Sequence, residues 1–165
     1  MINYCILVCN GNRARIFSFE AADSVDPLSG PRLVEKRDLV NAEAGTAGKN
    51  TWTDLKSGRN TAAGGGPAHG YDDHRDQHEE EFMRRFAVDV AAEVMHLMPA
   101  KKTTCLIIVA ANRMLGMLRN AIDLPTANHV EIKEVAKDLV RFSAQDIHEY
   151  LSGEGLLPAR KKLSA

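Results

Sequence analysis

The stretch TCLIIVAANRMLGMLRNAI, from Thr104 to Ile122, decides the fold class of this chain. Its first part, Thr104 to Ala111, is an uninterrupted apolar run, which is expected of a central strand buried on both faces. The part that follows, Arg113 to Ile122, is predicted to be a helix with Asn112 as its N-cap. A buried strand that leads directly into a helix is typical of an α/β sheet covered by helices.

Further elements are predicted on both sides of this unit. Upstream, apolar residues recur at spacings of three and four, which indicates a helix over Asp73 to Met98 that Pro99 is expected to end. Downstream, His129 to Val135 is predicted to be a strand. Ser143 is placed to cap a last short helix over Ala144 to Leu151.

The N-terminal part of the chain is expected to supply three strands. Two segments rich in β-formers, Tyr4 to Cys9 and Ala14 to Phe19, flank the tight-turn sequence Asn10-Gly11-Asn12 and predict a hairpin. Arg32 to Val40 is predicted to be the third strand. The order of elements implies a mixed β-sheet with helices packed on it. Residues 1–155 are expected to form one α/β domain, followed by a basic tail at 156–165.

Composition narrows the classes of protein to which the chain can belong. The apolar and charged fractions, 44% and 26%, are those of a soluble globular protein. A formal net charge of −1 argues against a non-specific DNA binder. Three cysteines without a CxxC motif favour a reducing cytoplasm. The N-terminus lacks the pattern of a signal peptide or membrane span, so a cytoplasmic protein is expected.

A glycine-rich loop is predicted over residues 41–70, between the third strand and the long helix. It holds Trp52 together with Lys56 and Arg59, a pairing of aromatic and basic groups that suits stacking on single-stranded RNA. The alternative is a solvated loop, since acidic residues are interleaved. The glycines Gly64, Gly65 and Gly66 match no P-loop motif. They are interpreted either as a flexible loop tip or as a ligand-binding turn.

Two other groups of residues are candidate sites. His74 and His78 are four residues apart on the predicted helix and, with Asp73, could chelate a divalent metal; the alternative is a solvated helix start. Asn112 and Arg113 follow the buried strand at its carboxyl end, where open α/β sheets bind ligands, and could hold an anion such as phosphate. The alternative there is a plain N-cap beside an exposed arginine.

The chain resembles a bacterial family described as required for attachment to host cells. The residues that carry the resemblance are the hairpin with Asn10-Gly11-Asn12-Arg13, the helical segment from Phe82 to Ala87 and the unit ending Leu115-Gly116-Met117-Leu118-Arg119, with Lys137-Asp138-Leu139 and Ser143 beyond it. That family is similar to the central domain of archaeal and eukaryotic peptide-chain release factors. This similarity implies an RNase-H-like fold and a partner in RNA or the ribosome.

The resemblance also bears on catalysis. In release factors a Gly-Gly-Gln sequence before the long helix promotes peptidyl-tRNA hydrolysis. Here Gly66 and Pro67 follow Gly64-Gly65, so the glutamine is absent. We therefore expect a non-catalytic RNA- or ribosome-associated accessory module without a cofactor. The alternatives are a metal-dependent hydrolase that uses His74 and His78, and a cytosolic regulatory protein that affects attachment.

Overall fold

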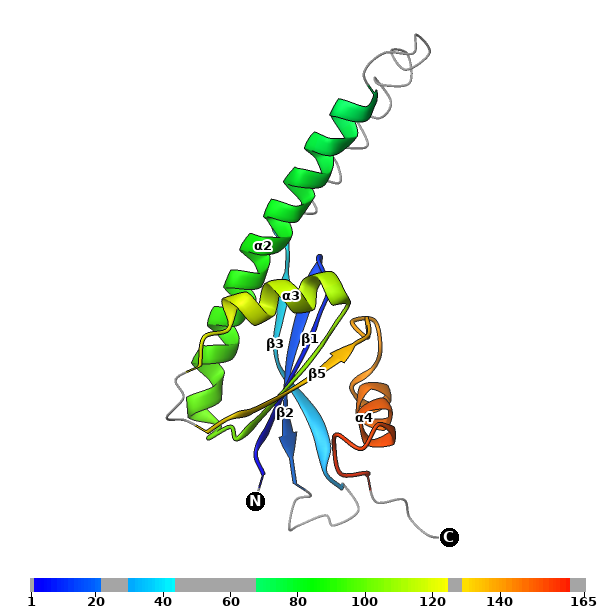
Figure 1. Ribbon diagram of the computed structural model, residues 1–165. Coiled ribbons are helices and arrows are strands. Elements are labelled where there is room, and N and C mark those ends of the chain that lie inside the picture. Colours follow the sequence, from blue (N-terminus) through cyan, green and yellow to red (C-terminus); the bar gives the residue numbers. More distant parts are fainter. Residues whose placement is uncertain (1, 22–29, 44–67, 125–128, 161–165) are drawn as a thin grey trace.

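The fold is a mixed five-stranded sheet with helices on both faces (Figure 1). The computed structural model describes residues 2–21, 30–43, 68–124 and 129–160, and gives the backbone alone for 68–76. The strands are β1 (Tyr4–Cys9), β2 (Arg13–Glu20), β3 (Arg32–Val40), β4 (Cys105–Ala110) and β5 (Glu131–Ala136). Their order is β3-β2-β1-β4-β5, with β1 antiparallel to β2 and parallel to β4.

Three helices cover this sheet: α2 (Ala68–Ala100), α3 (Asn112–Ala121) and α4 (Ala144–Gly153). One core lies between the sheet and helices α2 and α3, and includes Leu7, Leu106, Phe86 and Leu118. A second core on the opposite face contains Ile107 and side chains of α4 such as Ile147 and Leu151. The predicted α/β class with a mixed sheet is therefore confirmed.

Strand β4 is central, as its apolar run predicts. All six of its residues are buried, and it pairs in parallel with β1 on one side and β5 on the other. Its alternate side chains enter the two cores, Leu106 on the α2 side and Ile107 on the α4 side. A strand covered on both faces has no polar face, which explains why its sequence does not alternate.

The boundaries of α2 differ from the prediction at both ends. The helix begins at Ala68, five residues before Asp73, and it includes the last three residues of the predicted loop. It also continues through Pro99 to Ala100. The helix stops just beyond the proline, where Lys102 adopts a φ of 51° and the Thr103 N–H donates to the Met98 carbonyl.

The start of α3 corrects a second expectation. Ala111, in extended backbone, is the N-cap, whereas Asn112 is already the first helical residue. Within the described residues, no side-chain cap hydrogen bond is made at this N-cap. The prediction of Asn112 as N-cap is thus wrong by one residue. By contrast, Ser143 caps α4 as predicted, because its hydroxyl accepts a hydrogen bond from the Asp146 N–H at 3.1 Å.

The end of the described chain packs back onto the α4 face. Leu157 is buried in the second core. The buried ring of His148 shares a hydrogen bond of 2.8 Å between its Nε2 and the Pro158 carbonyl, and it meets Phe19 edge to face. The packed chain therefore extends to Pro158.

Candidate functional site

The carboxyl ends of the three parallel strands meet at one edge of the sheet, where α/β proteins usually place ligands. Asn10 follows β1, Ala111 follows β4 and Asp138 lies two residues beyond β5. Across this edge the Asn10 Nδ2 donates to the Asp138 Oδ2 at 3.3 Å. The fold thus joins two polar side chains that are 128 positions apart in the sequence.

Both members of this pair also hold the backbone around them. The Asn10 Oδ1 accepts hydrogen bonds from the N–H groups of Asn12 and Arg13, at 2.9 and 2.8 Å. The Asp138 Oδ1 accepts from the Val140 N–H at 3.2 Å. Sequence reasoning identified Asn10 only as a turn residue and gave Asp138 no role. No local signal indicates that the two meet.

A buried arginine fixes the segment that follows β5. Arg15 is 8% exposed, and its guanidinium donates to both carboxylate oxygens of Glu35, at 2.7 and 3.2 Å. The same group donates to the carbonyls of Val140 and Phe142, at 3.0 and 2.5 Å, and lies 5.0 Å from the ring centre of Phe17. Arg15 is therefore a positioning residue for this edge.

Two arginines converge on one exposed carboxylate beside this edge. Arg84 from α2 and Arg113 from α3 approach Glu80 at 3.5 and 3.6 Å. All three side chains are roughly half exposed, at 57%, 54% and 44%. The packing of α3 against α2 brings the two guanidinium groups together, although 29 residues separate them in sequence. Such loose surface pairs contribute about 0–1 kcal/mol each.

The N-terminus of α3 adjoins this arginine pair. Because the N-cap residue Ala111 has no side-chain oxygen, it makes no capping bond to the first N–H groups of α3. Asn112 and Arg113 are both exposed there. An N-terminus with a neighbouring arginine suits an anion such as phosphate. Asn112 and Arg113 both lie within the described structure, and anion binding by them stays a prediction.

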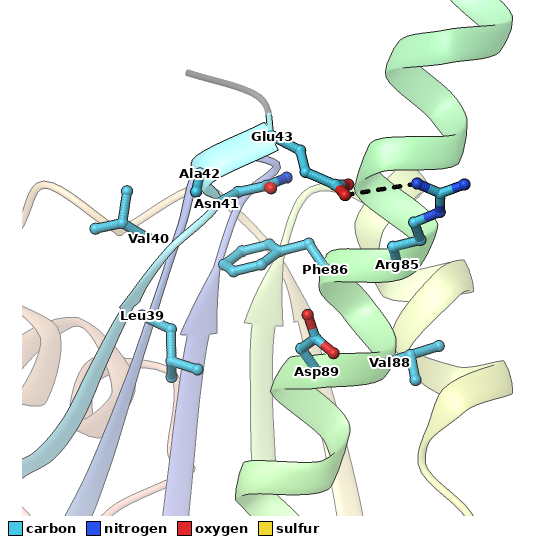
Figure 2. Close-up of a pocket in the computed structure, with 9 residues that line it drawn as sticks. All are labelled: Leu39, Val40, Asn41, Ala42, Glu43, Arg85, Phe86, Val88 and Asp89. Atoms are coloured by element: carbon cyan, nitrogen blue, oxygen red, sulfur yellow. Dashed lines mark hydrogen bonds and ion pairs between the residues drawn. The ribbon is translucent and has the colours of Figure 1, made fainter. Parts of the chain in front are cut away.

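A groove of about 460 Å³ lies between the end of β3 and α2, as Figure 2 shows. Apolar side chains of Leu39, Val40, Phe86 and Val88 line it. At one end the Arg85 guanidinium reaches Glu43 at 3.5 Å. Arg85, which lines the groove, follows Arg84 on the same helix.

The remaining predicted site residues fall into two groups. Trp52, Lys56, Arg59, Gly64, Gly65 and Gly66 lie outside the described residues. Asp73 and His74 belong to α2, with their side chains likewise outside the description. His78 is exposed and stacks on Phe82 at 6.2 Å between ring centres. Among the described side chains no group of three metal-binding residues occurs, so the proposed metal site stays a prediction.

The three cysteines are buried and unpaired. Burial raises the pKa of Cys5 and of Cys9 to about 12, and the nearby Asp138 carboxylate adds to the effect at Cys9. Burial also raises the pKa of Cys105. A thiol acts as a nucleophile through its thiolate. None of these cysteines is therefore suited to nucleophilic chemistry at neutral pH.

Comparison with known proteins assigns the chain to a family. No curated protein matches it significantly. Among the described helices none is long and apolar enough to cross a membrane. A family model described as "Protein required for attachment to host cells" matches residues 5–151, which include all five strands from Cys5 onward and most of α4. The chain therefore belongs to the family of proteins required for attachment to host cells.

Proposed function

We propose that this member of the host-attachment family is a non-catalytic accessory module that binds RNA in the cytoplasm and associates with the ribosome. The observation that carries the proposal is the convergence of Arg84 and Arg113 on Glu80. A guanidinium binds phosphate and carboxylate with the same fork of donors. A backbone phosphate of RNA can therefore replace the Glu80 carboxylate between the two arginines.

Two neighbouring features favour phosphate at this position. The uncapped N-terminus of α3 presents N–H groups beside Arg113. The existing ion pairs of Glu80 are long and exposed, so their exchange for phosphate costs little free energy. The acidic residues further toward the N-terminus of α2, from Asp72 to Glu79, repel a polyanion. RNA is accordingly expected to bind near the sheet, where the arginines lie, and to avoid the acidic turns.

The resemblance to release factors supports RNA and the ribosome as partners. In this chain, as in that central domain, a long helix follows a glycine-rich segment, and the RNase-H-like form of the fold belongs to this proposal. Trp52, Lys56 and Arg59 in that segment remain predicted RNA contacts. Gly66 stands where release factors have their catalytic glutamine, so the proposal includes no hydrolytic step. An effect on attachment would then arise through synthesis of other proteins.

Binding of a labelled single-stranded RNA, followed by fluorescence anisotropy at several salt concentrations, tests the proposal. Arg84→Ala and Arg113→Ala should each weaken binding and lower the salt slope by about 0.7 per lost phosphate contact. Glu80→Gln should strengthen binding, because it removes the one carboxylate that both arginines approach; Arg84 keeps its shorter pair with Glu81 at 3.0 Å. Arg119→Ala is the matched control, since Arg119 lies in the last turn of α3 and pairs with Glu134 instead.

Sedimentation of cell extract through a sucrose gradient tests the ribosomal part. We expect a fraction of the protein to sediment with ribosomes and to leave them in the Arg84→Ala, Arg113→Ala double variant. Weaker RNA binding by Glu80→Gln, or protein confined to the top fractions under growth and stress conditions, would contradict the proposal.

A further inference from the structure

Strand β5 forms one edge of the sheet, and within the described chain no strand pairs with its outer side. Unlike β4, it contains no buried residue. Its Ile132 is 44% exposed, one of the few large apolar side chains so exposed. An open edge of this kind is a template for another strand. We propose that β5 of a second copy of this chain pairs with it in antiparallel orientation, which forms a two-fold symmetric dimer with one continuous sheet.

The direction of the backbone groups limits the register of this pairing. The Glu131 N–H donates to the Thr104 carbonyl at 2.9 Å, so the backbone of Glu131 faces β4. Backbone groups of successive strand residues point to opposite sides, and the outer side therefore belongs to Val130, Ile132 and Glu134. Two copies can exchange hydrogen bonds only where residues of this outward set stand opposite each other.

Charge selects one register from those that remain. With Ile132 opposite Ile132 of the second copy, Glu131 stands opposite Lys133, and two-fold symmetry repeats this pair. A shift of two residues in either direction sets Glu131 opposite Glu131 or Lys133 opposite Lys133. Opposite charges in cross-strand pairs are favourable and like charges are unfavourable. The sequence Glu-Ile-Lys at 131–133 is thus complementary to itself in that register alone.

In the proposed dimer, the apolar contact between the Ile132 side chains and the Glu131–Lys133 ion pairs lie on opposite faces of the sheet. Ile132 is paired in register with Leu106, whose side chain enters the core beneath α2 and α3. The two Ile132 side chains would meet on that face. Glu131 and Lys133 are in register with Cys105 and Ile107, which belong to the opposite face. A contact of one short strand buries less than the ~1,200 Å² of a standard interface, so dimerisation should depend on concentration.

Analytical ultracentrifugation of the full chain tests the inference. The wild type should pass from the 18.1 kDa monomer toward twice that mass as concentration rises. Lys133→Glu and Glu131→Lys should each remain monomeric, because each sets like charges opposite each other twice. An equimolar mixture of the two variants should form dimers, since one copy then carries two carboxylates where the other carries two ammonium groups. The double variant should dimerise like the wild type.

Lys137→Glu is the control, because it makes the same charge change one residue beyond the end of β5. It should leave dimerisation unchanged, and circular dichroism should show every variant folded. A wild type that stays monomeric up to its solubility limit would overturn the inference. So would a dimer that persists in both single variants, or a mixture of the two that fails to associate.

Discussion

The two halves of helix α2 share one backbone and differ in what surrounds them. From Phe86 to Met98 six apolar residues of the helix are buried in the core against the sheet, including Val90 and Val94. From Gln77 to Arg85 none of its residues is buried, and Figure 1 shows this half projecting beyond the sheet. From Ala68 to Arg85 it is about 26 Å long at ~1.5 Å per residue.

The difference shows that tertiary packing and local charge pairs stabilise helices by separate routes. The packed half gains free energy by burying apolar area. The projecting half is mostly polar apart from the partly buried Phe82 and Met83, and pairs such as Arg84 with Glu80 and Arg85 with Glu81 link successive turns. A helix propagates more easily than it nucleates. The packed half therefore acts as the nucleus from which the projecting half extends.

The largest expected difference in stability is between variants of two phenylalanines, one in each half of α2. Phe86→Ala should lower the free energy of unfolding by about 4 kcal/mol, because it leaves a cavity in a close-packed core. Phe82→Ala, one turn earlier, should cost less than about 1 kcal/mol, because Phe82 is only partly buried and stacks on His78. Urea denaturation measures both. Similar losses would mean that the projecting half is packed in solution.

A pair of arginines extends the comparison to polar groups. Arg15→Ala should destabilise the fold by about 3 kcal/mol, because the Glu35 carboxylate and the carbonyls of Val140 and Phe142 lose the guanidinium that donates to them. Arg85→Ala, which breaks exposed pairs with Glu81 and Glu43, should cost about 0.5 kcal/mol or less. Thermal unfolding of the two variants provides the measurement. A larger loss for Arg85 than for Arg15 would reverse the comparison.

A glycine substitution tests whether the projecting half unfolds on its own. Glycine in an exposed helix interior costs about 1 kcal/mol relative to alanine. In Glu79→Gly, compared with Glu79→Ala, this cost should make local unfolding of the start of α2 easier. Amides before residue 79 should then exchange hydrogen faster, while the free energy of global unfolding stays the same. Hydrogen exchange monitored by mass spectrometry checks this. A matching drop in the urea midpoint would instead show that both halves unfold together.

The smallest expected effect on stability concerns the ion pair between Arg13 and Asp38 on the sheet. The hydrogen bond from Arg13 lowers the pKa of Asp38, which lies diagonally across from it on β3. Since the pKa is lower in the folded state, the stabilisation is present above the unfolded pKa of about 3.9 and is lost as pH falls through the folded value. Asp38→Asn should remove this part of the acid dependence, by about 0.5 kcal/mol at most, because both side chains are exposed. Denaturation at pH 7 and pH 3 measures it, and an unchanged pH dependence would contradict it.

Several elements could be predicted because their cause is local. The β-formers and turn residues of the N-terminal hairpin, the apolar run of β4 and the cap at Ser143 all act over a few neighbouring positions. Membership of the host-attachment family was likewise expected from short motifs such as the unit ending Leu115-Gly116-Met117-Leu118-Arg119, and that family is confirmed over residues 5–151. The start of α2 was missed because the helix extends from its packed half through sequence with little apolar periodicity.

The α/β class, the central strand and the order of the elements follow from the sequence alone, because hydrophobic pattern and turn chemistry depend on adjacent residues. Which distant groups meet depends on tertiary packing. Asn10 donates a hydrogen bond to Asp138, and Arg15 donates one to the Val140 carbonyl in the segment after β5. Arg84 and Arg113 both approach Glu80. Each of these contacts joins elements that different parts of the chain supply. The packing of the helices on the sheet determines these contacts, and no local sequence pattern predicts them.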